Sequence, residues 1–236
     1  MRNDERKDNQ LRKISIIPHY IESEEASVLV KFGKTHVLVT ATASEGVPPF
    51  LKHGGWITAE YGMLPRSSPQ RISRERKGVA GRSTEIQRLI GRSLRAACDL
   101  EKLNDYTIII DADVIQADGG TRTASITGGY VALYIKLKQM LKEKKIEDFP
   151  IVRQIAAVSA GIKDKKILLD LNYIEDSTTD VDLNLVADSK FSIIEIQGTG
   201  ERATFTVNQL NEMLKVMKRG LAELFEIQRD VLKKYE

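Results

Sequence analysis

The chain has 236 residues, of which 42% are hydrophobic and 29% are charged, and its net charge is +3. This ordinary globular composition, with a single cysteine, excludes intrinsic disorder, collagen-like repeats and a disulfide-stabilised scaffold. The first ten residues are too charged for a signal peptide, and no apolar run approaches the roughly 18 residues that span a bilayer. We therefore expect a soluble, cytoplasmic protein with no membrane partner.

The chain contains few of the side chains that usually act as metal ligands or nucleophiles. Cys98 lies within a helical pattern, and His19, His36 and His53 are scattered singly along the first quarter of the sequence. No zinc site or Cys/His nucleophile can be assembled from this set, and Cys98 is predicted to be a small core residue. Any chemistry must therefore be done by carboxylates, arginines, hydroxyls and backbone groups.

Short β-branched runs separated by turn formers predict an antiparallel meander in the first part of the chain. Its strands cover residues 13–20, 26–32 and 35–43, and a fourth strand covers residues 56–64. A helix is expected from Ser83 or Thr84, because Thr84 and Gln87 have the spacing of a capping box and apolar residues recur beyond them. A strand over 106–116 and a helix over 126–145 follow.

The second half repeats this theme. Strands are expected over residues 151–162, 167–171, 179–187 and 193–197, followed by a helix over 208–234. The apolar stripe of that helix is interpreted as core rather than as a groove for a partner. Two successive sets of sheet and helix, with few strand–helix–strand crossovers, indicate the α+β class rather than a doubly wound sheet. Pro150 is the only candidate seam, so we expect pseudo-repeated halves of about 1–149 and 150–236.

A glycine turn, residues 116–125, lies between a predicted strand and a predicted helix. Gly119 and Gly120 allow close backbone approach to a ligand, and the start of a helix offers free N–H groups and a positive dipole end. Arg122 adds a planar set of donors suited to phosphate. An anion site and a simple glycine turn with a capping hydroxyl are both compatible with this pattern, which is neither a Walker loop nor a dinucleotide fingerprint.

An acidic cluster places four carboxylates, Glu175, Asp176, Asp180 and Asp182, within eight residues. If residues 179–187 are extended, Asp180 and Asp182 point the same way, and Asp176 can fold back towards them. Hard oxygen ligands suit Mg²⁺, which prefers one or two carboxylates together with water and substrate phosphate. The alternative interpretation is an acidic, solvated turn at a strand edge.

An arginine loop, residues 66–82, holds five arginines, one lysine and one glutamate, so its net charge is +5. The basic character of the protein is therefore local. Arginines among serine, glycine and proline suit a polyanion-binding arm, because phosphate contacts dominate nucleic-acid affinity. We therefore predict that RNA binds to Arg66, Arg71, Arg74 and Arg76, although a merely solvated loop is the alternative.

Four segments in order, Gly54–Arg66, Gly81–Arg92, Asp113–Gly128 and Gln197–Phe205, are similar to the motifs of one family. In these segments the chain resembles, essentially end to end, the RNase PH family of phosphate-dependent exoribonucleases, which trim the 3′ ends of tRNA precursors. The resemblance implies a fold like the second domain of ribosomal protein S5, duplicated, and a homohexamer built as a trimer of dimers. One departure is Glu5, which stands where the family usually has glycine.

The resemblance also implies roles for individual residues. The matching positions for phosphate are Arg82, Gly120, Thr121, Arg122 and, nearby, Ser125. Asp176 and Asp182 match the catalytic carboxylates, which also hold the divalent metal, Mg²⁺.

The implied activity is phosphorolytic removal of terminal nucleotides from tRNA precursors, with inorganic phosphate as co-substrate and nucleoside diphosphates as products. Such an enzyme is a reversible nucleotidyltransferase. Two alternatives belong to other classes of protein. One is a catalytically weak RNA-binding ring subunit of exosome type, and the other is a hydrolytic metal nuclease, in which Arg122 would have no clear role.

Overall fold

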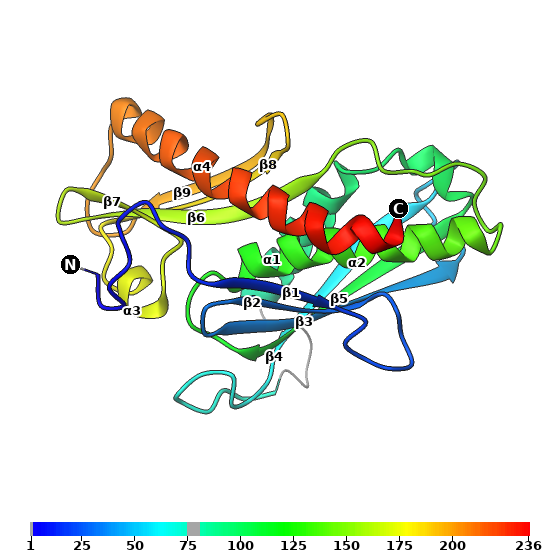
Figure 1. The fold of residues 1–236 in the computed structure, drawn as a ribbon, viewed down its shortest axis with the longest axis horizontal. Helices are drawn as coiled ribbons and strands as arrows, with labels where there is room; N and C mark the ends of the chain where they lie inside the picture. The colour runs from blue at the N-terminus through cyan, green and yellow to red at the C-terminus, as the bar shows by residue number, and fades with distance from the viewer. Residues whose placement is uncertain (1, 75–80) are drawn as a thin grey trace.

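Two β-sheets, one from each half of the chain, form the framework of the computed structural model, which describes residues 2–74 and 81–236 (Figure 1). The first sheet has the order β1-β2-β3-β5-β4, with β1 (Ile14–Pro18), β2 (Ser27–Phe32), β3 (Thr35–Glu45), β4 (Trp56–Met63) and β5 (Tyr106–Gln116). The second has the order β7-β6-β8-β9, with β6 (Ile155–Lys163), β7 (Lys166–Leu169), β8 (Val181–Asp188) and β9 (Ile193–Gly200).

The predicted meander is confirmed, because β1, β2 and β3 pair antiparallel in sequence order. Val37, Val39 and Ala41 alternate towards the core along β3, as the period of a strand requires. The fourth strand does not extend the meander. β4 lies at the far edge and pairs parallel with β5, and the connection between them contains α1 (Gly81–Arg95). The helix of this strand–helix–strand unit packs against the sheet at β4. The other strand pairs of the sheet are antiparallel.

Two helix starts differ from the sequence-based expectation. α1 begins at Gly81, so Thr84 lies inside the helix and does not cap it. α2 (Thr121–Lys142) begins five residues before the expected position. The first turn of α2 is polar, so apolar periodicity does not detect it. The helix begins directly after Gly120, which has the left-handed conformation with φ 66°.

α2 is the central helix and packs against β2 and β3 on one side and β6 on the other. It is therefore buried nearly all round, which explains its weak amphipathic pattern. At Gly128 a Cβ would lie 2.9 Å from Val30 Cγ1, so only glycine permits this close approach. No helix among the described residues, α2 included, is long and apolar enough to cross a membrane.

The long C-terminal helix, α4 (Val207–Leu232), packs its apolar stripe on β6, β1 and β7, as the core interpretation predicted (Figure 1). Cys98 is also a core residue, and burial raises the pKa of its thiol to about 12. The α+β class is confirmed. A short helix, α3 (Tyr173–Asp176), was not expected from the sequence.

A buried ion pair between Arg12 and Asp170 connects the two halves of the chain. Arg12 donates from Nη2 to Asp170 Oδ1 at 2.7 Å and from Nε to Oδ2 at 3.0 Å, and its backbone N–H donates to Oδ2 at 2.8 Å. Asp170 has no exposed surface, and its backbone has a φ of 54°. Nearby, Arg2 forms a second buried pair with Glu175 at 2.6 Å, which ties the N-terminal segment to α3.

We predict that Asp170→Asn lowers the free energy of unfolding by roughly 3 kcal/mol, because it leaves the Arg12 guanidinium buried without its counter-charge. Asparagine tolerates the left-handed conformation as aspartate does, so the change isolates the charge. Urea denaturation measures the effect. Asp230→Asn, in an exposed pair with Lys233, is the control and should leave the midpoint unchanged. Equal midpoints for both variants would contradict the prediction.

Candidate active site

The start of α2 is built to approach a ligand closely. Gly119 and Gly120 both have positive φ, 74° and 66°, and a Cβ on Gly119 would lie 2.7 Å from the Leu171 carbonyl oxygen. The first intrahelical bond runs from the Ala124 N–H to the Gly120 carbonyl, and no side chain caps the helix. The positive end of a 22-residue helix is therefore available to an anion at this turn.

Hydrogen bonds from Arg12 and Thr35 hold the glycine turn in place. Arg12 Nη1 donates to the Asp118 carbonyl at 2.6 Å, and Thr35 Oγ1 donates to the Gly119 carbonyl at 2.6 Å. The Asp118 N–H donates in turn to Thr35 Oγ1 at 2.9 Å. Because these donors are themselves largely buried, the turn keeps its shape without a ligand.

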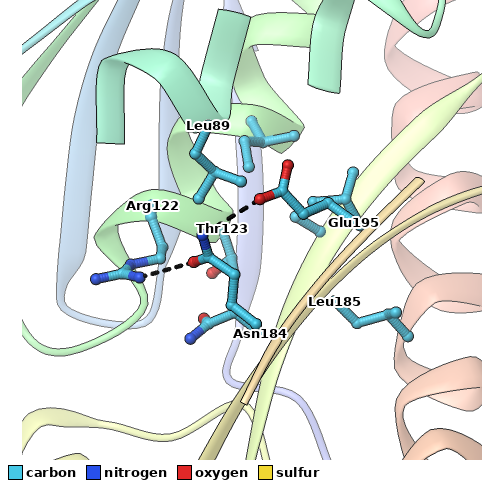
Figure 2. A pocket seen from close by; sticks show the side chains of 10 residues that line it. Leu89, Arg122, Thr123, Asn184, Leu185 and Glu195 are labelled. Carbon is cyan, nitrogen blue, oxygen red and sulfur yellow. Dashed lines mark hydrogen bonds between the residues drawn. The ribbon is translucent and has the colours of Figure 1, made fainter. Parts of the chain in front are cut away.

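Two arginines, one on α1 and one on α2, lie close to Asp176. Arg122 is mostly buried, donates from Nη1 to Gln197 Oε1 at 3.1 Å and lies 3.6 Å from Glu85 Oε1 (Figure 2). Arg82 is exposed on the first turn of α1 and has no hydrogen bond or ion pair to the part of the chain that is described. The charges of both arginines act on Asp176. Arg82, Arg122 and Asp176 therefore face one region.

The two carboxylates that the family motif indicated also meet there. Asp182 is the second residue of β8, and desolvation, followed by the negative charge of Asp176, raises its pKa to about 6. Asn184 Nδ2 donates to Asp182 Oδ2 at 3.0 Å. Desolvation also raises the pKa of Asp176, against the opposing charges of Arg122 and Arg82. The Asp176 residue as a whole is solvent-exposed, and Arg122 and Arg82 are the cations near its carboxylate.

β8 begins at Val181, one residue after Asp180 and two residues after the expected start. The Asp180 backbone N–H donates to the Ile162 carbonyl at 2.8 Å. The charges that act on Asp182 come from Asp176, Arg122 and Glu201. Asp180 is not among these charges, and its sharing of a strand face with Asp182 stays a prediction. Glu201 is an acidic neighbour that the sequence patterns did not single out.

The hydroxyls of the glycine turn are already engaged. Thr121 Oγ1 accepts a hydrogen bond from Tyr61 Oη at 2.9 Å. Ser125 is fully buried, and its Oγ donates to the Thr121 carbonyl at 2.8 Å. Ser125 therefore lies inside the helix behind the turn, whereas Thr121 and Gly120 line its open side.

The described part of the arginine loop projects from the body of the molecule after β4 (Figure 1). Arg66, Arg71 and Arg74 are all exposed, and Arg66 Nη1 donates to the Pro69 carbonyl at 3.1 Å. Arg76 lies outside the described residues. The base of the loop touches the glycine turn, because the Ala117 N–H donates to the Ser67 carbonyl at 2.7 Å.

The donor set at Asp176 and Asp182 fits a divalent cation such as Mg²⁺. In the described residues no group of three or more His, Cys, Asp or Glu side chains is arranged to hold a metal. Mg²⁺ is commonly held by one or two carboxylates, with water and substrate phosphate as its other ligands. Burial, and after it the negative charge of Asp176, raises the pKa of Asp182, and a bound cation would stabilise both carboxylates in their charged form.

The chain matches two family models, described as the 3′ exoribonuclease family, domain 1, over residues 10–136, and domain 2, over residues 153–220. It is 50% identical to ribonuclease PH of Bacillus cereus strain AH820 over 237 residues, which cover 98% of this chain and 97% of the relative. Ribonuclease PH of Bacillus anthracis matches with the same identity and coverage.

Solved structures share this fold. A chain from the Archaeoglobus fulgidus exosome with RNA bound to the active site has a TM-score of 0.80 and 27% identity, over 95% of this chain and 91% of that one. Rice Rrp46 has a TM-score of 0.78 and 17% identity, over 98% of this chain and all of that one. The latter likeness concerns the fold alone.

We predict that Asp182→Asn stabilises the metal-free protein at pH 8. A carboxyl whose pKa rises from 3.8 to about 6 on folding reduces stability above pH 6, by up to about 3 kcal/mol. This loss fades as the pH falls from 6 towards 4, where the folded carboxyl is protonated. Denaturation in EDTA from pH 4 to pH 8 measures the difference in stability between the variant and the parent. Asp148→Asn, at an exposed carboxylate, is the control. A difference that does not vary with pH would refute the prediction.

Proposed function

The chain belongs to the 3′ exoribonuclease family, and we infer that it removes nucleotides from RNA 3′ ends by phosphorolysis. In this reaction, inorganic phosphate attacks the terminal phosphodiester in place of water. The bond from that phosphorus to the 3′ oxygen of the preceding nucleotide breaks, which releases a nucleoside diphosphate and a shortened RNA. Because one phosphate linkage replaces another, the enzyme is a reversible nucleotidyltransferase.

The observation that carries the proposal is the meeting of Arg82, Arg122 and two carboxylates in front of an uncapped helix start. Arg82 and Arg122, with the backbone of Gly120 and Thr121, would hold the attacking phosphate. Two guanidinium groups and a helix dipole lower the repulsion between this anion and the RNA phosphate. Ser125 would support this site from behind through its bond to the Thr121 carbonyl.

Asp176 and Asp182 would hold Mg²⁺ next to the scissile phosphate. The bound ion would stabilise the negative charge on the scissile group and on the leaving oxygen. Asn184 keeps the Asp182 carboxylate oriented through its hydrogen bond. Phosphate is already anionic at neutral pH, so the chain needs neither a strong general base nor a covalent nucleophile.

We propose that the substrates are tRNA precursors and other RNA 3′ ends, bound in part through the arginine loop. The motifs that match the family support a homohexamer, a trimer of dimers, as the working assembly, and a cytoplasmic location.

The two other classes of protein account less well for the site. An RNA-binding subunit without catalysis does not require the paired carboxylates, which cost stability above pH 6. A hydrolytic nuclease does not require Arg82 and Arg122 around a helix start. Incubation with RNA and Mg²⁺, with and without orthophosphate, separates the three classes. Nucleoside diphosphates that appear only with orthophosphate support phosphorolysis, monophosphates indicate hydrolysis, and intact RNA indicates a binding subunit.

We predict that Arg122→Ala nearly abolishes phosphorolysis and weakens phosphate binding while the fold persists. A charge-assisted hydrogen bond contributes about 1.5–3 kcal/mol to binding, and more where it tightens in the transition state. Kinetics over a phosphate titration and circular dichroism measure both effects. Parental kinetics at saturating phosphate would remove Arg122 from the site.

We predict that replacing Arg71 and Arg74 together with alanine raises the KM for a tRNA precursor and leaves the phosphate dependence unchanged. For a duplex stem, the log–log salt slope should fall by about 0.9 for every phosphate that an arginine no longer neutralises. A salt series with tRNA measures the slope, and a short single-stranded oligonucleotide that cannot reach the loop is the control. Parental affinity and slope for tRNA would assign the loop to packing or subunit contacts.

A further inference from the structure

Among the described residues, the one side-chain hydrogen bond of the Arg122 guanidinium goes to a neutral amide, while Glu85 Oε1 lies farther away, 3.6 Å from Arg122 Nη1. Arg122 Nη1 donates to the amide oxygen of Gln197 on β9, at 3.1 Å. Gln197 on β9 is directly opposite Asn184 on the neighbouring strand β8. Both residues line the same narrow cavity beside Arg122 (Figure 2).

The Gln197 amide can face Arg122 in only one orientation. Its Nε2 donates to Glu195 Oε1 at 3.2 Å and to Glu85 Oε1 at 3.3 Å. If the amide were turned over, its oxygen would face two carboxylates and its N–H₂ group would face a guanidinium. The surrounding charges therefore fix the oxygen towards Arg122, as the hydrogen bonds in Figure 2 show.

Glu195 is itself anchored. Arg92 on α1 forms a bidentate ion pair with both Glu195 carboxylate oxygens, which joins α1 to β9 across the cavity. The Glu195 side chain is only 16% exposed, so this bridge is better protected from solvent than a surface pair. A continuous chain of contacts thus runs from Arg92 through Glu195 and Gln197 to Arg122.

We propose that Gln197 is a positioning residue for Arg122, oriented by the Arg92–Glu195 bridge, and that it sets the affinity of the site for inorganic phosphate. This inference rests on the proposed function and deepens it. Gln197 and Glu85 both lie at Nη1 of Arg122, and the amide, the nearer of the two at 3.1 Å, aims the guanidinium without adding a second carboxylate that competes for it. The remaining Arg122 donors then stay available to the phosphate oxygens.

Two variants of Gln197 test the role of the acceptor. Gln197→Leu removes the acceptor at similar volume and should raise the KM for phosphate about tenfold, the effect of removing one hydrogen bond to a charged group. Gln197→Glu places a second carboxylate beside Arg122, in addition to Glu85, and should raise that KM further. The KM for RNA should stay near the parental value in both variants. Calorimetry of phosphate binding without RNA gives a second measure that does not depend on turnover.

Gln139→Glu is the matched control. The Gln139 amide also donates to a glutamate, Glu25, at 2.9 Å, but it lies on α2 about 27 Å along the helix from Thr121. Gln139→Glu makes the same chemical change as Gln197→Glu and adds the same charge, so the KM of this variant for phosphate should equal the parental value.

A double-mutant cycle tests the bridge. Glu195→Gln alone should raise the phosphate KM about threefold, and adding it to Gln197→Leu should raise it no further, because both changes act through one chain of contacts. Parental phosphate affinity in both Gln197 variants would overturn the inference. So would an equal loss in kcat and in both KM values together with a lowered Tm, which marks a structural role. If the parent enzyme needs no phosphate, the proposed function itself fails, and the inference fails with it.

Discussion

The pairing of Arg12 with Asp170 is the interaction on which the rest of the site depends. Arg12 lies just before β1 in the first half of the chain, and Asp170 follows β7 in the second. The same guanidinium also donates to carbonyls of the glycine turn, so one side chain fixes both the glycine-turn end and the α3 end of the site. A buried charge is tolerated only when its polar atoms are matched, and the Arg12 donors find Asp170, Asp118, Gly119 and Thr35.

Opposite charges have to coexist within this frame. The proposed function needs cations for the attacking phosphate and anions for the metal, and the arginines lie close enough to the two carboxylates to oppose the rise in their pKa values. Desolvation raises the pKa of Asp176 although the two arginines oppose it, and desolvation with the Asp176 charge raises that of Asp182 to about 6. Empty of substrate and metal, such an arrangement reduces the stability of the fold. That cost is characteristic of a binding site, since a purely structural cluster would be expected to pair its charges fully.

Some of this arrangement could be predicted from the sequence, and some could not. The strands, the long C-terminal helix and the glycine turn follow from local periodicity and turn chemistry. Family motifs singled out Asp176 and Asp182, whereas strand alternation alone would pair Asp180 with Asp182. Neither source indicated that α2 starts at Thr121 or that β4 pairs with β5. Contacts such as Arg12–Asp170 join residues 158 positions apart, so no local pattern could reveal them. In the sequence, Gln197 stood out only as part of a family motif. Its proposed positioning role depends on Arg122, Glu85 and Glu195, which come from α2, α1 and β9.

The arginines show why partners matter more than residue counts. Arg2 and Arg12 are buried against carboxylates, so their charges are neutralised within the fold. Arg122 is held by an amide and only loosely by Glu85, while Arg82, Arg71 and Arg74 are exposed. The phosphate oxygens of a substrate can recruit a guanidinium only when its donors are not already committed to a carboxylate. By this criterion the structure divides chemically identical residues into those that build the frame and those that are left to bind anions, a division that the +3 net charge of the chain does not disclose.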